Sequence, residues 1–454
     1  MREVRRRAPR LWPVLGVVLA LAGCAALDPY NVVGRALPRA EVASDAPSGE
    51  ERRAQREAAV ELVWRTVLER YWRADLNGVD WHAARARWAP LAIAAQTDEA
   101  FWELLDRMTG ELGDSHTRVE SPTAVALRRA EQARGLGLSL RELEGELIVT
   151  SVHAESDAWW AGIRPGMRIE AIEEQDALTL WRRWLEQARP VSSPQAALRQ
   201  PIRALNRLAE GSDGGVRLRV ERQDGSRFDV RLRVGTFSTR AVALGRTLPS
   251  GFGYVRFSAF RESIRARVLE LIREQSATPG LVLDLRGNGG GSAAMVDAIA
   301  GAFFRERTLI ARTQTRTGAP VTVIGVPIMP PERYAPGDPQ AFTGPVAVLI
   351  DHGTASAAEA LAAALQATGR ARVFGETSCG CLLAFLGYVR LPGGGELAYS
   401  EIGYTDAQGR LIEGRGIVPD VPIAITRAAL REGRDRVLEA AVAWLEQQRP
   451  LSGR

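Results

Sequence analysis

Apolar positions between residues 50 and 108 follow the period of an amphipathic helix, because they recur every three or four residues. This spacing places them on one helical face that has to be buried, so we predict a helical domain over residues 50–130. The side chains that carry the repeat are Ala59, Leu62, Val63, Val67, Phe101, Leu104, Leu105 and Met108.

Residues 131–236 show a different pattern, with short runs in which apolar and polar residues alternate. Alternation with a period of two is typical of half-buried strands and predicts a β domain. Between residues 179 and 210 the pattern becomes helical, which indicates an insertion in that domain. The predicted strands are Leu147–Val152, Arg168–Ile172, Val216–Glu221 and Phe228–Val234.

From Gly253 onward, strongly apolar short runs alternate with helical stretches, and this repetition predicts a βαβ architecture. We bound this core at 237–430 and expect a C-terminal helix within 431–454. The proline-rich segment Val326–Thr343 is predicted to be a surface loop near the functional site. The predicted strands are Gly253–Phe257, Gly280–Leu285 and Val346–Ile350, and the predicted helices are Ser263–Gln275, Ala293–Phe304 and Ala357–Ala367.

Composition excludes one class of partner and one class of catalyst. The formal net charge is only +5 over 454 residues. No basic patch is interleaved with aromatic residues, so we predict no nucleic-acid binding. All basic residues other than the histidines are arginines, since the sequence contains no lysine. A catalytic lysine is therefore ruled out.

The N-terminus has the pattern of a targeting segment. Five arginines precede an apolar run from Leu11 to Ala22, which is too short for a comfortable membrane-spanning helix. The run ends in Leu-Ala-Gly-Cys24, which resembles the lipobox of bacterial lipoproteins. The resemblance implies a signal peptide over residues 1–24 and a lipid anchor on Cys24 that holds the chain at a membrane surface. Ala25 rather than aspartate follows, and resemblance to the sorting pattern of lipoproteins in Gram-negative bacteria implies the outer membrane of the cell envelope, facing the periplasm. Residues 25–49 are predicted to be a tether.

The two remaining cysteines, Cys379 and Cys381, are separated by a single residue. In an oxidising compartment they could pair, in a tight and strained ring, or stay free. The sequence leaves both states open. No other group of potential ligands lies close by, so a metal site is not predicted.

Ser356 lies between a predicted buried strand and an alanine-rich helix. A serine at this place is most often a helix cap. The same place suits a nucleophile, because free amides at a helix N-terminus face a developing oxyanion. The glycine-rich turn Leu283–Gly291 follows another buried strand and lacks the Lys-Ser/Thr of a phosphate-binding loop. Such a turn can bring backbone amides close to a substrate carbonyl.

Several motifs give the chain a family resemblance. Gly135–Leu140 and Ala161–Ile169 resemble two signatures of a PDZ domain, which implies peptide binding at Leu136, Gly137 and Leu138. From about residue 50 to 430 the chain resembles the carboxyl-terminal-processing and tricorn-core family of serine peptidases. The resemblance implies a multidomain α/β protein with a crotonase-like peptidase core. The other matching motifs are Glu111–Thr117, Asp284–Gly290, Gly353–Glu359, Gly375-Glu376 and Gly414–Asp420.

The resemblance implies that Ser356 is the nucleophile, and the family has two designs for its base. In one the base is a lysine, and this chain has Cys381 at that place. In the other a histidine from the N-terminal segment is oriented by a late glutamate, which implies His116 as the base and Glu413 as its partner. The backbone amides expected to bind the oxyanion are those of Gly289, Gly290 and Ala357.

Other residues compete for these roles. Glu401 and Glu376 are alternatives to Glu413, and His352, four residues before the serine, is an alternative base. Cys381 is a further but poorly supported nucleophile. His82 and His153 are interpreted as packing or strand-end residues, and Asp284 with Arg286 as a structural ion pair.

These assignments predict a serine endopeptidase that cleaves polypeptides at the bacterial cell envelope through an acyl-enzyme. No metal or organic cofactor is implied. The alternative is a catalytically inactive relative that uses the PDZ-like domain and the cleft to bind peptides or to act as a scaffold. The oligomeric state is not predicted.

Overall fold

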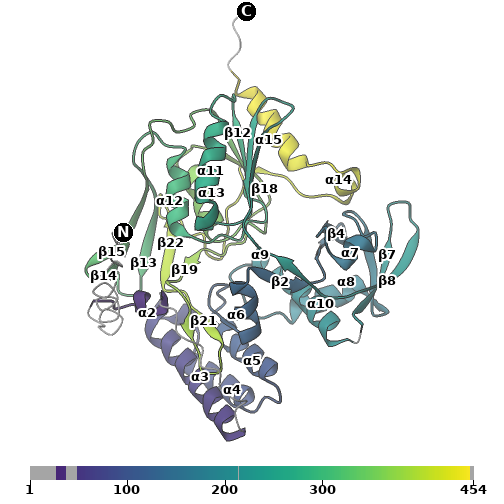
Figure 1. The fold of residues 1–454 in the computed structure, drawn as a ribbon, viewed down its shortest axis with the longest axis vertical. Coiled ribbons are helices and arrows are strands. Elements are labelled where there is room, and N and C mark those ends of the chain that lie inside the picture. The colour runs from purple at the N-terminus through teal and green to yellow at the C-terminus, as the bar shows by residue number, and fades with distance from the viewer. Residues whose placement is uncertain (1–26, 37–48, 213, 450–454) are drawn as a thin grey trace, which may run out of the picture.

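The computed structural model describes residues 27–36, 49–212 and 214–449. Figure 1 shows three parts of this chain: a helical part at the bottom, a β-rich part at the right and a larger sheet-and-helix part at the top. They correspond in order to the predicted helical domain, middle domain and core.

The helical domain packs large apolar side chains where its helices cross. Trp81, Phe101, Leu105 and Met108 are buried together with Tyr71, as expected for helices that present one apolar face. The helices begin at side-chain caps, from Asp80 in α4 and from Thr97 in α5. The elements are α3 (Gly49–Arg70), η1 (Leu76–Gly78), α4 (Trp81–Ile93), α5 (Asp98–Gly110), β1 (Arg118–Glu120) and α6 (Pro122–Arg129).

One strand joins the helical domain to the distant end of the chain. β1 pairs antiparallel with β21 (Glu396–Ala398), and β21 pairs with β20 (Val389–Arg390). His116 lies in the short loop between α5 and β1, so this pairing fixes the loop against the core.

The predicted tether contains a short helix, α2 (Val32–Ala36). Its Arg35 forms an ion pair with Glu401 at 2.7 Å and donates to the Tyr399 hydroxyl at 2.6 Å. Two buried polar partners thus hold Arg35 of this segment on the core.

The middle domain is a curved sheet covered by helices. Its strand order is β3-β4-β5-β7-β8, with β6 beside β5. The chain enters and leaves through the antiparallel pair of β2 (Gln132–Gly135) and β9 (Gly235–Ser238). The strands are β3 (Leu138–Leu143), β4 (Glu146–Val152), β5 (Arg168–Ile172), β6 (Gln175–Asp176), β7 (Val216–Glu221) and β8 (Arg227–Leu232), and the helices are α7 (Asp157–Trp160), α8 (Ala177–Glu186), α9 (Pro194–Ala197) and α10 (Gln200–Gly211).

The core is built on a six-stranded sheet with helices on both faces. Leu281 and Leu283 of β12 face α11, α12 and α13, whereas Val282 faces α15. Burial on both faces explains the continuous apolar runs in the sequence. All strand pairs are parallel except the first. The strand order is β10 (Ala243–Thr247), β11 (Gly253–Phe257), β12 (Leu281–Asp284), β17 (Val346–Ile350), β18 (Arg372–Gly375) and β23 (Val421–Pro422), and the helices are α11 (Glu262–Glu274), α12 (Ala293–Gly301), α13 (Ala357–Ala367) and α15 (Arg436–Gln447).

A second, smaller sheet lies at the side of the core. It has the order β16-β13-β22-β19, and a separate hairpin of β14 and β15 projects beside it (Figure 1). The prediction of a loop over Val326–Thr343 was wrong, because strands β15 and β16 occupy its first half. The elements are β13 (Thr308–Thr315), β14 (Val321–Val323), β15 (Val326–Met329), β16 (Glu332–Ala335), β19 (Leu383–Ala384), β22 (Ile402–Asp406) and α14 (Arg427–Glu432).

Among the described residues, none of the helices combines the length and the apolar character needed to span a bilayer. The predicted signal peptide and Cys24 lie outside the described residues.

Candidate active site

Ser356 stands on a sharp turn between β17 and α13. Its backbone has φ 55° and ψ −121°, a conformation that L-residues rarely adopt. Two hydrogen bonds hold the turn, because the Ser356 amide donates at 3.0 Å both to the Cys381 carbonyl and to Glu359 Oε2. Backbone strain held in place by its surroundings is concentrated at functional sites. Here it presents the hydroxyl at the N-terminus of a helix.

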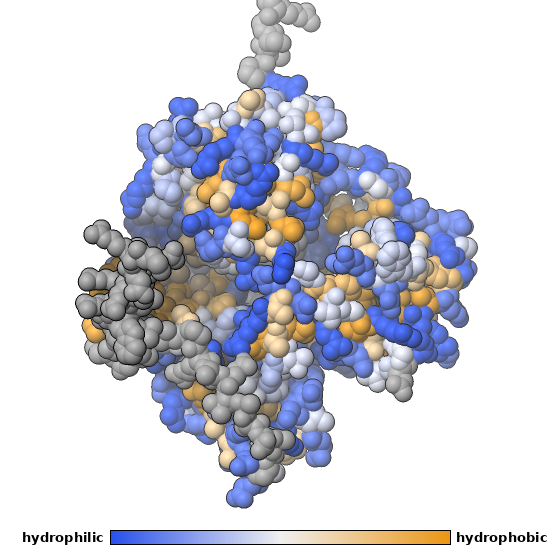
Figure 2. Space-filling view, viewed as in Figure 1, coloured by the Kyte–Doolittle hydropathy of each residue, from blue (hydrophilic) through white to orange (hydrophobic). Residues whose placement is uncertain are grey.

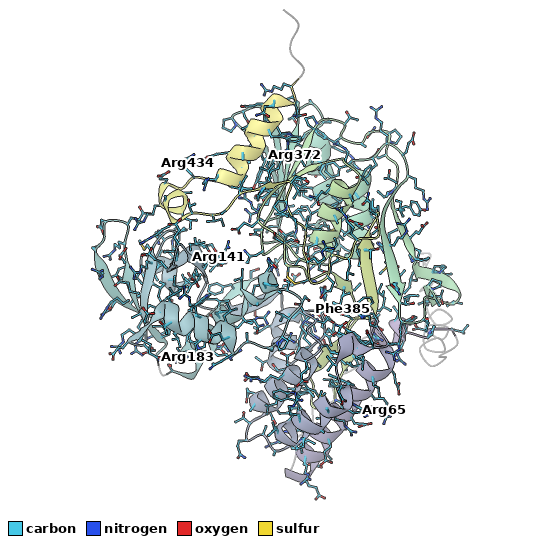
Figure 3. The ribbon with its side chains drawn as sticks, turned by 180° about the vertical axis from the view of Figure 1, so that it is seen from behind. Arg65, Arg141, Arg183, Arg372, Phe385 and Arg434 are labelled. Carbon is cyan, nitrogen blue, oxygen red and sulfur yellow. A yellow bond between two sulfur atoms is a disulfide. The ribbon has the colours of Figure 1, made fainter. Side chains whose placement is uncertain are left out.

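His116 reaches the serine from the helical domain, 240 residues upstream. Its Nε2 lies 3.2 Å from Ser356 Oγ, which is hydrogen-bonding distance for proton transfer. The ring lies near Phe385, with 6.4 Å between the centroids. Figure 3 shows Phe385 where the core meets the helical domain. The structure therefore brings together the two residues that the sequence assigned as nucleophile and base.

Asp114 holds the loop that carries this histidine. Its Oδ1 accepts from the His116 amide at 2.7 Å, and its Oδ2 accepts from the hydroxyls of Thr117 and Ser400 at 2.5 and 2.6 Å. Ser400 follows β21, so the carboxylate ties the loop to the core as well. The sequence analysis missed this role. The available signal was an aspartate two residues before the histidine, the spacing of an Asx turn.

Burial decides the charge of the imidazole. It lowers the pKa of His116 to about 4, with Asp114 opposing and Arg118 reinforcing the change. The ring is consequently neutral at pH 7, as a general base must be before it accepts a proton. Its Nδ1 is buried, and no described residue forms a hydrogen bond with it.

Glu413 does not make the expected hydrogen bond to His116. Its Oε2 instead accepts from the Leu382 amide at 2.7 Å. Burial, followed by the nearby charge of Asp114, raises its pKa well above the usual value. The orienting role of Glu413 therefore stays a prediction, because in this structure its carboxylate forms no hydrogen bond with His116 Nδ1.

The two alternative glutamates are engaged elsewhere. Glu401 pairs with Arg35, and Glu376 pairs with Arg141 of β3 at 2.5 Å. Arg141 is labelled in Figure 3, on the side of the middle domain that faces the core. His352 lies 3.9 Å from Glu376, and burial lowers its pKa.

Backbone amides stand close to the serine hydroxyl. A Cβ added to Gly290 would lie 2.7 Å from both the Ala357 nitrogen and Ser356 Cβ, so only glycine permits this approach. The Gly290 amide donates to Asn288 Oδ1 at 2.9 Å. The amides of Gly289 and Ala357 have no acceptor among the described residues. These two amides, rather than that of Gly290, are available to a developing oxyanion.

A buried carboxylate supports the nucleophile turn from behind. Glu359 is fully buried, and its Oε1 accepts from the Ser378 hydroxyl at 2.6 Å and the Gly380 amide at 2.7 Å. Its Oε2 accepts from the amides of Ser356 and Cys381, both at 3.0 Å. Burial raises the pKa of Glu359, and the four donors oppose this change. One side chain therefore couples Ser356 to the loop that contains the cysteines.

Cys379 and Cys381 form a disulfide in that loop, which resolves the alternative that the sequence left open. Both are buried. The Cys379 amide donates to the Thr354 carbonyl at 2.9 Å, and the Cys381 carbonyl accepts from Ser356. The loop therefore contacts the nucleophile turn on both sides of Ala355.

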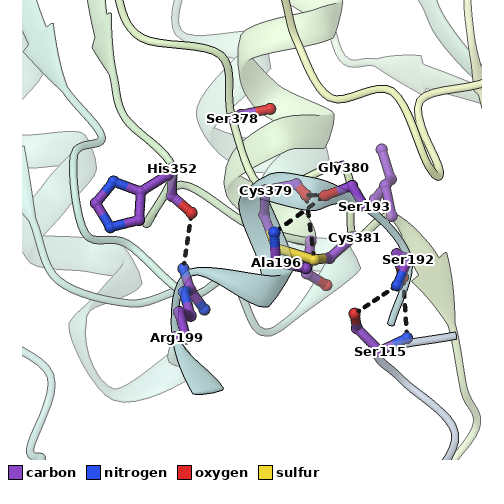
Figure 4. The surroundings of a disulfide bond; sticks show 12 residues. Ser115, Ser192, Ser193, Ala196, Arg199, His352, Ser378, Cys379, Gly380 and Cys381 are labelled. Atoms are coloured by element: carbon purple, nitrogen blue, oxygen red, sulfur yellow. Dashed lines mark hydrogen bonds between the residues drawn. A yellow bond between two sulfur atoms is a disulfide. The ribbon is translucent and has the colours of Figure 1, made fainter. Parts of the chain in front are cut away.

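The helical insertion of the middle domain packs directly on this site (Figure 4). Ser192 and Ser115 exchange two hydrogen bonds, of 2.9 and 3.2 Å. Ser193 donates to the Cys379 carbonyl. Arg199 donates to the Gly353 carbonyl at 2.6 Å, in the turn before Ser356. The insertion consequently touches all three segments that build the site.

A cleft lies between the middle domain and the core. Its volume is about 690 Å³, and its lining includes Arg164 of the middle domain and Asp351 and Glu376 of the core. Asp351 precedes Ser356 by five residues. The residues that line the cleft do not include Ser356 or His116.

The remaining residues singled out in the sequence form contacts away from Ser356. The Leu136 amide donates to Asn206 Oδ1 of α10 at 3.0 Å, and Gly137 has φ 68° at the start of β3. Arg286 pairs with Asp284 at 2.6 Å, which confirms the structural ion pair. His82 packs on Trp64 and His153 on Phe237, with centroids 5.1 and 4.5 Å apart, and Leu138 is buried in the middle domain.

Comparisons with known proteins place this chain among peptidase-like sequences. Residues 251–423 match peptidase family S41, and residues 52–110 match the tricorn protease C1 domain. A carboxyl-terminal-processing protease from Synechocystis is 26% identical over 79% of this chain and 78% of its own length. Tricorn protease homolog 1 from Streptomyces coelicolor is 25% identical over 84% of this chain, which spans only 34% of that relative.

Solved structures show the same fold at low identity. The photosystem II D1 C-terminal processing protease aligns with a TM-score of 0.53 and 20% identity, over 86% of this chain and 97% of its own. Mature CPAF aligns with a TM-score of 0.63 and 13% identity, over 87% of this chain and 96% of its own. The chain thus has an S41 peptidase domain behind a segment that matches the tricorn C1 domain, and the proteins it resembles are carboxyl-terminal-processing proteases and tricorn protease homologs.

Proposed function

We propose that this chain is a serine endopeptidase in which Ser356 attacks the peptide bond and His116 is the general base. The observation that supports this most directly is the 3.2 Å contact between His116 Nε2 and Ser356 Oγ. It occurs at a strained turn, in a chain that has no lysine to serve instead.

The chemistry follows from these positions. Ser356 Oγ forms a bond to the substrate carbonyl carbon while its proton moves to His116 Nε2. The negative charge on the carbonyl oxygen is met by the amides of Gly289 and Ala357, and one such donor is typically worth about 3 kcal/mol of barrier. The C–N bond then breaks, and the Nε2 proton goes to the leaving amine. Water, deprotonated by the same nitrogen, releases the acyl group and regenerates the serine.

The transient imidazolium needs negative charge nearby, because the site is buried. Asp114 supplies it, since this carboxylate is the group that raises the pKa of His116 against the effect of burial. We therefore assign Asp114 a positioning and electrostatic role. This assignment adds a carboxylate to the predicted pair of His116 and Glu413.

We also propose that the middle domain is PDZ-like and presents a polypeptide end to a crotonase-like core. Its strand β3 is at the edge of its sheet, where a peptide can add by backbone pairing. A peptide carboxylate at Leu136 would compete with Asn206, which now accepts from that amide. The substrate class is therefore a polypeptide that enters through the cleft between middle domain and core.

Anchoring at the cell envelope through Cys24 completes the proposal. It rests on the lipobox pattern and places polypeptides of the periplasm within reach of the site.

The experiment is cleavage of an unfolded polypeptide, followed by mass spectrometry. The wild-type chain is expected to produce internal fragments, and Ser356→Ala to produce none. Ser276→Ala changes an exposed serine of the core and should cleave like wild type. Cleavage by Ser356→Ala at the wild-type rate, or no cleavage by a folded wild-type chain, would overturn the proposal.

A further inference from the structure

The hairpin of β14 and β15 carries an unusually apolar surface. Residues 320–331 contain one polar side chain, Thr322, and no charged one. The exposed fractions are 52% for Ile324, 62% for Val326 and 42% for Ile328. Contiguous aliphatic groups in water are costly and usually mark a contact surface.

The turn of this hairpin retains an aliphatic residue where the backbone disfavours one. Val323 pairs with Val326, so Ile324 and Gly325 form the two-residue turn. Their φ values are 53° and 73°. Such turns favour Asn-Gly or Asp-Gly, and a β-branched residue at positive φ is a genuine outlier. An aliphatic group is thus held at the exposed tip against local preference, which points to a use for it.

The tip is tied to the beginning of the described chain. The Ile324 amide donates to the Leu27 carbonyl at 2.7 Å, and Leu27 is itself 41% exposed. Figure 1 shows β14 and β15 beside α2, on the side of the molecule away from the middle domain. In the space-filling view, orange surface is visible at this edge of the molecule (Figure 2).

Chain length brings this surface close to the predicted lipid. Cys24 precedes Leu27 by three residues, and three extended residues span at most about 11 Å. If Cys24 carries acyl chains, the hairpin tip cannot be far from the bilayer that holds them.

We propose that Ile324, Val326 and Ile328 enter the interfacial region of the bilayer beside the lipid on Cys24, an inference that rests on the proposed anchoring. A protein partner fits less well, because hot spots of protein interfaces are enriched in tryptophan, tyrosine and arginine, and this hairpin has none in residues 320–331. A second membrane contact beside the acyl chains restricts rotation about the anchor. It directs the middle domain away from the membrane, toward incoming polypeptides.

The test uses the lipidated full chain in phosphatidylethanolamine–phosphatidylglycerol vesicles. Val326→Cys is labelled with an environment-sensitive dye, and the matched control is Val242→Cys, because Val242 is 60% exposed in the linker between β9 and β10. The native disulfide is buried and does not compete for the label. Lipids with a nitroxide on the acyl chain report whether each dye enters the bilayer.

We expect the protein to sediment with the vesicles, and the dye at 326 to shift to shorter wavelength and lose most of its emission to the nitroxide. The dye at 242 should do neither. Equal quenching at both positions, no quenching at 326, or failure of the chain to bind vesicles would each overturn the proposal. Peptide hydrolysis by the same labelled samples is measured separately, so a failure of the proposed activity is distinguished from a failure of this contact.

Discussion

The carboxylate of Glu359 is the part of the site where a one-atom change should have the largest effect. It lies beneath the nucleophile turn and accepts four hydrogen bonds, two at each oxygen. Glu359→Gln keeps the shape of the side chain but replaces one accepting oxygen with an NH2 donor. If the NH2 group replaces Oε2, the amides of Ser356 and Cys381 face a donor. If it replaces Oε1, the Gly380 amide faces a donor, while the Ser378 hydroxyl can turn to accept.

The magnitude follows from the lost acceptor. At least one buried amide is left without a partner in either orientation, and each such donor costs about 1–3 kcal/mol of unfolding free energy. Removing a buried charge offsets part of this, because burial already disfavours the ionised form of Glu359. We expect a net loss of about 1–3 kcal/mol. If the turn shifts by about 1 Å, turnover falls by roughly a hundredfold.

Urea unfolding and peptide hydrolysis measure the two effects on the same samples. Glu439→Gln is the matched control, because Glu439 lies in the first turn of α15 and is 45% exposed. The control should change unfolding free energy by no more than about 0.5 kcal/mol and leave hydrolysis unaltered. A Glu359→Gln chain as stable and active as the control would refute the assignment of Glu359 as the support of Ser356.

Three further predictions concern the surroundings of the nucleophile. Because the folded pKa of His116 is about 4 against about 6.5 when unfolded, unfolding free energy should fall by about 3 kcal/mol as pH drops from 6.5 to 4. His116→Gln should lack this loss in denaturation measured across pH, and parallel curves would contradict it. Ser192→Ala removes a hydrogen bond to the loop that carries His116 and should lower kcat about tenfold with KM unchanged. An unaltered kcat would argue that the helical insertion does not hold this loop in place. The native disulfide closes only a very short loop, so replacing both cysteines (Cys379→Ser with Cys381→Ser) should change stability little while hydrolysis falls. Full hydrolysis by this variant would show that the disulfide is dispensable.

The regular part of the core could be predicted because its strands are buried on two faces. β11, β17 and α13 have the predicted bounds, since a continuous apolar run followed by a helical period leaves few alternatives. The hairpin of β14 and β15 was missed for the opposite reason. Its prolines indicate a loop, and β14 and β15 form a separate two-stranded sheet in which β15 is largely exposed, so burial leaves no pattern in the sequence.

The site could be predicted only in part, because its contacts join distant segments. His116 and Ser356 were found through family motifs, although 240 residues separate them. Glu359 had a local signal, the Ser-x-x-Glu spacing of a capping box. Ser192 had none, since its bonds to Ser115 span 77 residues. The predicted bond between Glu413 and His116 is absent, and the Glu413 carboxylate accepts from the Leu382 amide instead.

The central claim is that Ser356 is a nucleophile activated by His116. Labelling with a fluorophosphonate probe, located by mass spectrometry, measures this directly at pH 7 on folded protein. The account predicts a single adduct on Ser356 in the wild-type chain, and in His116→Ala a labelling rate lower by at least about a hundredfold. An intact wild-type chain without an adduct on Ser356, or a His116→Ala chain labelled as fast as wild type, would contradict it.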